Sequence, residues 1–211
     1  MASLPLRRAL GAVIVAAGLA ACAGTVPEGS LATTAPNGAA ERVPATVVRP
    51  DGPGPFPAVV ILHDCSGFGP RSSGAPARWS RELVARGYVV VIPDSFTTRG
   101  FPEGLCTDAS RSRGEVAPAR RVVDAYAALA QARALPFVDG RRVGVPTEHP
   151  VEIVVYPGAH HSFDSDRPVR FVASRVNMNA PGGRGAATGG DPRAWADSIR
   201  RVTEFFERTL R

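Results

Sequence analysis

The sequence contains the stretch Tyr88-Val89-Val90-Val91-Ile92, an unbroken run of five apolar residues. A second run of this kind, Ala58-Val59-Val60-Ile61-Leu62, lies earlier in the chain. Continuous apolar runs, in contrast to alternating ones, are typical of strands that are buried on both faces of a parallel sheet. Both segments are therefore predicted to be central strands of such a sheet.

Three helices are expected between and after these strands. The first runs from about Pro76, a residue suited to the first helical turn, to Arg86, and Gly87 ends it. The second covers 118–134, and its apolar side is expected to carry Val122, Val123, Tyr126 and Leu129. The third covers 191–210 with Asp191 as N-cap, and its apolar side carries Ile199, Val202, Phe205 and Phe206.

Further strands are expected over Arg42–Arg49, from Val143 to Val145, and over Val151–Tyr156. Residues 171–190 are expected to form a loop. The alternation of strands and helices predicts an α/β fold with a mostly parallel sheet. A parallel neighbour needs a crossover of about a dozen residues, and 146–150 is too short for one. The segment 151–156 must therefore pair antiparallel, pair elsewhere, or leave a sheet edge exposed.

The first 22 residues are predicted to be a secretory signal peptide. Arg7 and Arg8 precede an apolar run over 9–21, which is well short of the roughly 20 residues that cross a bilayer, so a signal is favoured over a membrane anchor. The ending Leu19-Ala20-Ala21-Cys22 resembles a lipobox, which implies lipidation of Cys22, although an incidental cysteine at an ordinary cleavage site is the alternative.

Lipidation of Cys22 implies an exported bacterial lipoprotein that a lipid anchor holds at the membrane. Ala23 and Gly24 suggest the outer membrane, facing the periplasm. Residues 23–40 have the composition of a flexible linker, and residues 41–211 are predicted to be the folded domain.

The chain has 211 residues and a formal net charge of +6, all of its cationic side chains being arginine. These arginines are scattered and form no stripe, which argues against a nucleic-acid partner.

Export places Cys65 and Cys106 in an oxidising compartment, where they either pair in a disulfide or remain free thiols, since spacing does not decide between the two.

Five segments together resemble the dienelactone hydrolase branch of the α/β-hydrolases. They occur in the family's order and are 59–67, 87–96, 135–139, 142–145 and 156–163. The resemblance implies a three-layer fold and hydrolysis of small esters or lactones by nucleophilic catalysis without a cofactor. It also implies that His161, in the sequence Gly158-Ala159-His160-His161-Ser162-Phe163, is the catalytic histidine, and that the loop Asp64, Cys65, Ser66 supplies the oxyanion hole.

The family's nucleophile is missing from the expected place. The segment 142–145 runs into 146–150 where the family has Gly-x-[Ser/Cys]-x-Gly, and that motif occurs nowhere in the chain. The closest string, 104–108, lacks the second glycine, and the family's acidic residue is also absent. The fold is therefore predicted to lack its central strands and the helix of the nucleophile elbow.

Three interpretations remain open. The chain is a family member with little or no activity that binds a small carbonyl ligand at the envelope, a hydrolase that recruits Cys65, Ser66 or Cys106 onto His161, or a truncated reading of an intact gene. The first is favoured over the second because loss of a nucleophile costs several orders of magnitude in rate. The pair His160-His161 alone does not supply a three-ligand metal site, so no metal is expected.

Overall fold

The computed structural model describes residues 25–106, 114, 116–144, 153–177 and 179–210. The predicted signal peptide, Cys22 and the segment 146–150 lie outside the described residues. None of the described helices is both long enough and apolar enough to cross a lipid bilayer.

The main sheet has five strands in the order β1-β2-β4-β3-β5. β2 runs antiparallel to β1 and β4, whereas β3 runs parallel to β4 and β5. The α/β class is confirmed, and the sheet is mixed, with its parallel pairings confined to β4, β3 and β5. The strands are β1 (Thr25–Thr34), β2 (Ala40–Val48), β3 (Phe56–Val60), β4 (Val89–Pro93) and β5 (Val138–Gly144).

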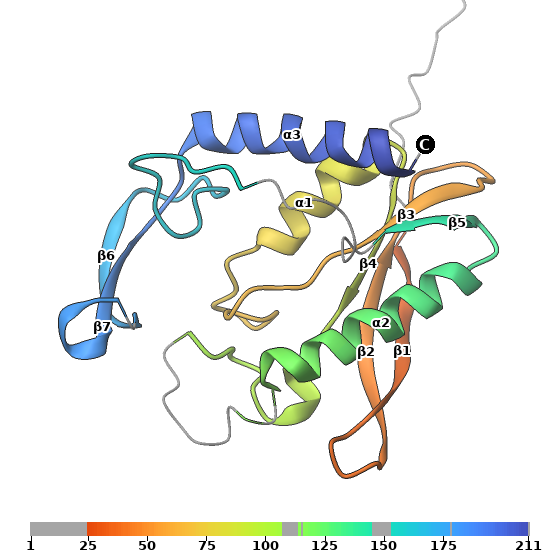
Figure 1. The fold of residues 1–211 in the computed structure, drawn as a ribbon, viewed down its shortest axis with the longest axis horizontal. Coiled ribbons are helices and arrows are strands. Elements are labelled where there is room, and N and C mark those ends of the chain that lie inside the picture. Colours follow the sequence, from red (N-terminus) through yellow and green to blue (C-terminus); the bar gives the residue numbers. More distant parts are fainter. Residues whose placement is uncertain (1–24, 107–113, 115, 145–152, 178, 211) are drawn as a thin grey trace, which may run out of the picture.

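Helices cover both faces of this sheet (Figure 1), with α2 on one face and α1 and α3 on the other. The helices are α1 (Ala75–Val84), α2 (Pro118–Ala134) and α3 (Pro192–Leu210). Their bounds agree closely with the prediction, and the Asp191 carboxylate caps α3 by accepting the N–H groups of Arg193 and Ala194, both at 3.0 Å.

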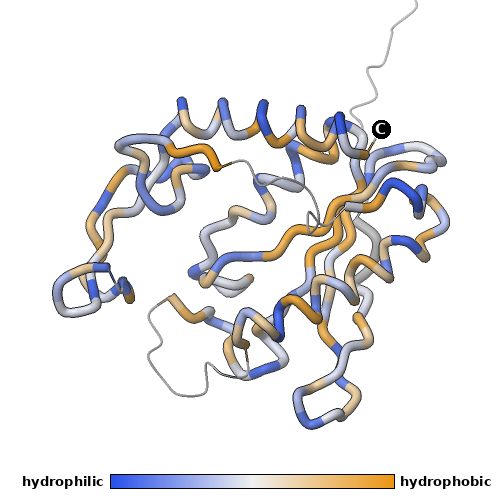
Figure 2. Tube along the Cα trace, in the orientation of Figure 1, coloured by the Kyte–Doolittle hydropathy of each residue, from blue (hydrophilic) through white to orange (hydrophobic). Residues whose placement is uncertain are grey.

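The central strand β4 shows why its sequence is apolar throughout. Val89 and Val91 pack into the core beneath α2, whereas Val90 and Ile92 pack into the core beneath α1 and α3. Figure 2 shows the most hydrophobic part of the chain running along these strands. Because successive side chains of a strand point to opposite faces, a strand with both faces buried needs an unbroken apolar run.

The apolar side predicted for α2 is confirmed at Leu129 and wrong at the other three residues. Val122, Val123 and Tyr126 are exposed, and the buried side carries Arg120 and Asp124, followed by small residues and Leu129. The reason is a group of ion pairs that draws those two charged side chains inward, so the helix is oriented by electrostatics as well as by apolar burial.

The predicted flexible linker is also corrected, because β1 occupies most of it and pairs antiparallel with β2. Leu31 and Thr33 are buried, and the residues on either side of them are exposed. This alternation with a period of two is the strand signal, which the surrounding Gly, Ala and Thr composition obscured.

The C-terminal part departs most from expectation. Residues 171–190, predicted as loop, include an antiparallel hairpin of β6 (Arg170–Val176) and β7 (Arg184–Thr188), joined through a short 3-10 turn, η3 (Pro181–Gly183). Conversely, 153–156 forms no strand, and Ile153 and Val155 are 81% and 76% exposed. The eight residues between Gly144 and Ile153 are too few for a parallel crossover back to the edge of β5.

Candidate active site

The loop after β3 is built around His63, which is almost fully buried. Its Nε2 accepts the N–H of Ser95 at 3.1 Å, so the ring proton lies on Nδ1, which donates to the Asp64 carbonyl oxygen at 2.9 Å. The rings of Phe96 and Phe68 meet the imidazole edge-on. Burial lowers the pKa of His63, so this histidine stays neutral and holds the loop in place.

The next residues form a closed set of hydrogen bonds around the Asp64 carboxylate. Ser66 donates both its backbone N–H, at 2.8 Å, and its hydroxyl to Asp64 Oδ1. Burial raises the pKa of Asp64, but hydrogen bonds from Ser66 and Ser73 outweigh it and hold the pKa below its ordinary value. The loop of Asp64, Cys65 and Ser66 is predicted to supply the oxyanion hole, and within it the Ser66 N–H is engaged by an ionised carboxylate.

Cys65 and Cys106 form a disulfide, with their Cα atoms 5.0 Å apart. The bond ties the loop after β3 to the segment that follows the 3-10 turn η1 (Thr97–Arg99). The backbone approach beside it is close enough to require glycine at Gly104, where φ is +80° and a Cβ would lie 2.6 Å from the Cys65 carbonyl oxygen. Neither sulfur is a thiolate while the bond is intact, so neither serves as a nucleophile.

His161 is held by the β6–β7 hairpin. Its carbonyl oxygen accepts the Gly189 N–H at 2.9 Å and the Thr188 hydroxyl at 2.8 Å. On the ring, Nδ1 lies 2.7 Å from an Nη of Arg175 and 2.8 Å from the Ser162 hydroxyl. A guanidinium only donates hydrogen bonds, so Nδ1 must accept, and the hydrogen-bond pattern assigns the ring proton to Nε2.

This tautomer is opposite to the one that nucleophilic hydrolysis uses. In a catalytic triad an acid accepts the Nδ1 proton and Nε2 takes the proton of the nucleophile. Here a cation faces Nδ1. Partial burial lowers the pKa of His161, Arg175 lowers it further, and the charges of Asp64 and Asp164 oppose them. The ring is neutral near pH 7, but its Nε2 already carries the proton and cannot accept another.

The structure brings the His161 loop against the loop after β3. Arg78 forms an ion pair with Asp164 at 3.1 Å, and Arg167 donates to the Ser72 carbonyl oxygen at 3.2 Å. The hydrogen bonds found at the His161 ring include none to a carboxylate in the described part of the chain. Within that part, no three or more His, Cys, Asp or Glu side chains gather as a metal site would require.

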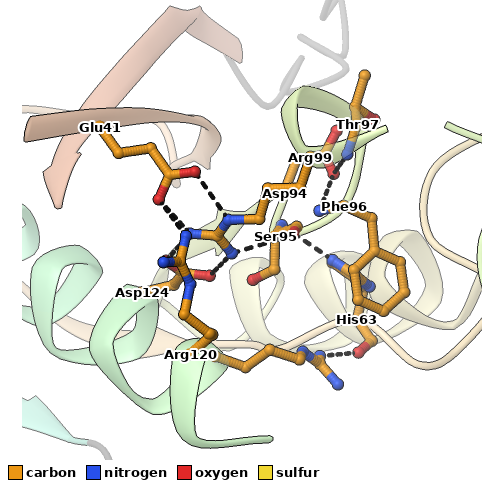
Figure 3. A network of polar contacts seen from close by, with 10 residues as sticks. Glu41, His63, Asp94, Ser95, Phe96, Thr97, Arg99, Arg120 and Asp124 are labelled. Atoms are coloured by element: carbon orange, nitrogen blue, oxygen red, sulfur yellow. Dashed lines mark hydrogen bonds and ion pairs between the residues drawn. The ribbon is translucent and has the colours of Figure 1, made fainter. Parts of the chain in front are cut away.

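A buried ion network lies behind the His63 loop (Figure 3). Arg99 bridges Asp124, at 2.6 Å, and Glu41, at 2.9 Å, and Arg120 reaches Glu41 at 2.6 Å. Hydrogen bonding from Arg99 lowers the pKa of Glu41. Arg99 also donates to the Ser95 carbonyl oxygen at 3.0 Å, so the network supports the residue whose N–H fixes His63. The sequence analysis missed it, although Arg120 and Asp124 at i and i+4 on one helix face were a signal.

Residues 43–147, from within β2 to just past β5, match the dienelactone hydrolase family. The chain belongs to the dienelactone hydrolase family. The matched segment holds the His63–Ser66 loop, the disulfide and the ion network except for Glu41, whereas His161 lies beyond it.

Several solved structures of hydrolases are similar to this chain, at low sequence identity to it. A candidate dienelactone hydrolase from Klebsiella pneumoniae subsp. pneumoniae MGH 78578 is 22% identical over 57% of this chain and 48% of that one, with a TM-score of 0.40. The esterase Est22 is 17% identical over 57% and 34%, with a TM-score of 0.37, and Porphyromonas gingivalis dipeptidyl peptidase 4 is 20% identical over 56% and 16%, with a TM-score of 0.35. No curated protein matches. This dienelactone hydrolase family chain thus matches less than half the length of each of these three structures.

Two apolar cavities flank α1. The larger, about 740 Å³, lies between β2 and α1 and does not include His161. The second, about 370 Å³, lies beside the end of β3 and is lined by Asp64, Trp79 and Phe206 among others. The second adjoins the His63–Ser66 loop.

Proposed function

We propose that this member of the dienelactone hydrolase family has kept the family's frame but has little or no hydrolytic activity toward small esters or lactones. The contact that carries the proposal is the hydrogen bond from Arg175 to Nδ1 of His161. It leaves Nε2 protonated, so the candidate base has no free site for the proton of a nucleophile. The absence of the family's nucleophile motif from the sequence supports the same conclusion.

The test is hydrolysis of a short-chain chromogenic ester by the purified chain. We compare it with His161→Ala and with His160→Ala as the matched control, after circular dichroism has shown all three to be folded. We expect no rate above the buffer blank in any of them. Turnover that His161→Ala abolishes and His160→Ala retains would refute the proposal and establish a rebuilt active site.

A binding role is the second candidate, and the 370 Å³ apolar cavity beside Asp64 favours it. Trp79 lines this cavity and meets Trp195 edge-on at 4.6 Å, so its fluorescence is a direct reporter of occupancy. A small lactone should give a saturable change in tryptophan emission. A response that only grows in proportion to lactone concentration would count against the binding role.

We further propose that the protein is a lipoprotein of the bacterial envelope, anchored through acylated Cys22 and facing the periplasm. The proposal rests on the apolar run over 9–21 and the Leu19-Ala20-Ala21-Cys22 ending. Expression in a Gram-negative host should place the chain in the membrane fraction, and Cys22→Ser should release it. Equal membrane association of both would contradict lipidation at this residue.

A further inference from the structure

A small polar cavity of about 80 Å³ lies between the loop after β3 and the β6–β7 hairpin. Four arginines line it, and they come from three separate parts of the chain: Arg71, Arg167, Arg170 and Arg175. None of the described residues that line the cavity is acidic. The cavity therefore gathers cationic side chains in a chain whose arginines are otherwise scattered.

The arginines of this cavity keep donors available for a ligand. Arg175 Nε is buried and has no hydrogen-bond partner among the described residues. Arg71 has an acidic partner, Glu103, but the pair is 3.8 Å apart and open to solvent, and such pairs contribute little. A buried N–H donor that stays unpaired is costly, and an acceptor in the cavity would remove that cost.

Two carboxylates of the neighbouring loops, Asp164 and Asp64, are already held by other groups. Asp164 is paired with Arg78 at 3.1 Å, and Asp64 accepts both hydrogen bonds of Ser66. Neither lines the cavity. The positive charge of the cavity is therefore not balanced from within the site, and this favours an anionic occupant.

The donor set fits a tetrahedral anion better than a planar carboxylate. The available donors are the guanidinium groups. The hydroxyls of Ser162, Ser165 and Thr188 also line the cavity, but they already donate to His161 Nδ1 and to the carbonyl oxygens of Ser162 and His161 respectively. A dianion with several exposed oxygens can accept from more of these donors and offset more of the charge than a two-oxygen monoanion. The space, several times what one water needs, suits one such group and no larger head.

We propose that the cavity bounded by Arg71, Arg167, Arg170 and Arg175 is a binding site for a phosphate group. The site goes beyond the proposed loss of hydrolysis and does not depend on it, because the arginines would bind phosphate whether or not an ester is cleaved. Binding also affects His161, since a phosphate that engages Arg175 weakens its hydrogen bond to Nδ1 and places negative charge beside the imidazole. Phosphate therefore raises the pKa of His161.

The test is calorimetric titration of the purified chain with inorganic phosphate at fixed ionic strength, with acetate as the comparison anion. We expect saturable binding of phosphate, weaker binding of acetate, and a loss of phosphate affinity of about tenfold or more in Arg175→Gln. Arg170→Gln, at an exposed position, should weaken binding as well, and circular dichroism checks that this variant is folded. Arg208→Gln, on the exposed side of α3, is the matched control and should bind like the unchanged chain.

A spectroscopic measurement separates a specific site from general attraction. In NMR titrations, phosphate should raise the pKa of His161 in the unchanged chain and leave it unmoved in Arg175→Gln. The absence of saturable phosphate binding, or equal affinity in the two cavity variants and in Arg208→Gln, would overturn the proposal.

Two further arms identify the source of the phosphate group. Glycerol 3-phosphate tests a free small molecule, and vesicles with and without phosphatidic acid, whose headgroup is a phosphate monoester, test a lipid source. Affinity for glycerol 3-phosphate that depends on Arg175 assigns the site to soluble phosphate esters. Arg175-dependent binding to the anionic vesicles alone assigns it to lipid. If neither arm depends on Arg175, the proposal fails.

Discussion

Apolar residues of the same types are buried in one region of the molecule, residues 40–144, and exposed in another, residues 153–190. In the first region Val89, Val90 and Val91 have no exposed surface, because β4 has neighbours on both edges and helices on both faces. In the second, Ile153 and Val155 are mostly exposed. The contrast teaches that an apolar segment becomes a strand only where a sheet edge lies within reach of the chain.

The sharpest test of this contrast compares a buried carboxylate with an exposed one. Asp124→Ala should lower the free energy of unfolding by about 3 kcal/mol, because it removes the fully buried carboxylate partner of Arg99 and leaves this buried guanidinium with Glu41 as its one remaining ion-pair partner among the described residues. Asp197→Ala removes an equally short contact, 2.6 Å to Arg201 on the surface of α3, and should have little effect. Urea denaturation followed by circular dichroism measures both, and a loss from Asp124→Ala as small as that expected for Asp197→Ala would show that the network does not stabilise the first region.

The second test compares two apolar truncations. Leu83 is buried in the core beneath α1 and α3, so Leu83→Ala should destabilise by about 2–5 kcal/mol. Val155→Ala should change stability by no more than about 0.5 kcal/mol, since this side chain is mostly exposed. The same denaturation measurement applies. A large loss from Val155→Ala would mean that this segment packs against protein in solution.

The smallest expected effect is on the pH dependence of the free energy of unfolding, to which Glu41 of the first region contributes. The pKa of Glu41 is held below its ordinary value of 4.5 by Arg99. The stabilisation from Glu41 is therefore complete above pH 4.5 and is lost as the pH falls through the lower pKa of the folded state. Unfolding measured across this range should show a shallower acid dependence in Glu41→Gln. An unchanged slope would assign the acid sensitivity to other carboxylates.

The same contrast explains what could be predicted from the sequence. β3, β4 and α2 follow from run length and helix signals, which are local properties. Whether 153–156 forms a strand depends on the length of the preceding connection and on the edge it would have to reach. The hairpin of β6 and β7 has too little apolar alternation to be recognised.

The sequence predicts which residues lie at the candidate site, but not which nitrogen of the His161 ring carries the proton. The position of His161 near the loop after β3 follows from the family motif, and the disulfide was one of two open alternatives. The hydrogen bond from Arg175 is not predictable from the sequence, because residue 175 reaches the imidazole through the β6–β7 hairpin, a segment whose sequence predicts a loop. Nothing within the motif itself indicates which ring nitrogen carries the proton.

The connection after β5 has one more consequence. The outer edge of β5 pairs with no other described strand, and eight residues separate its end from Ile153. A connection lengthened to a dozen residues or more at this one junction would let the same apolar segment dock in parallel, with no other residue changed. The number of strands in this sheet is thus limited by the length of the connection that follows β5, and an insertion at that one position would add a strand.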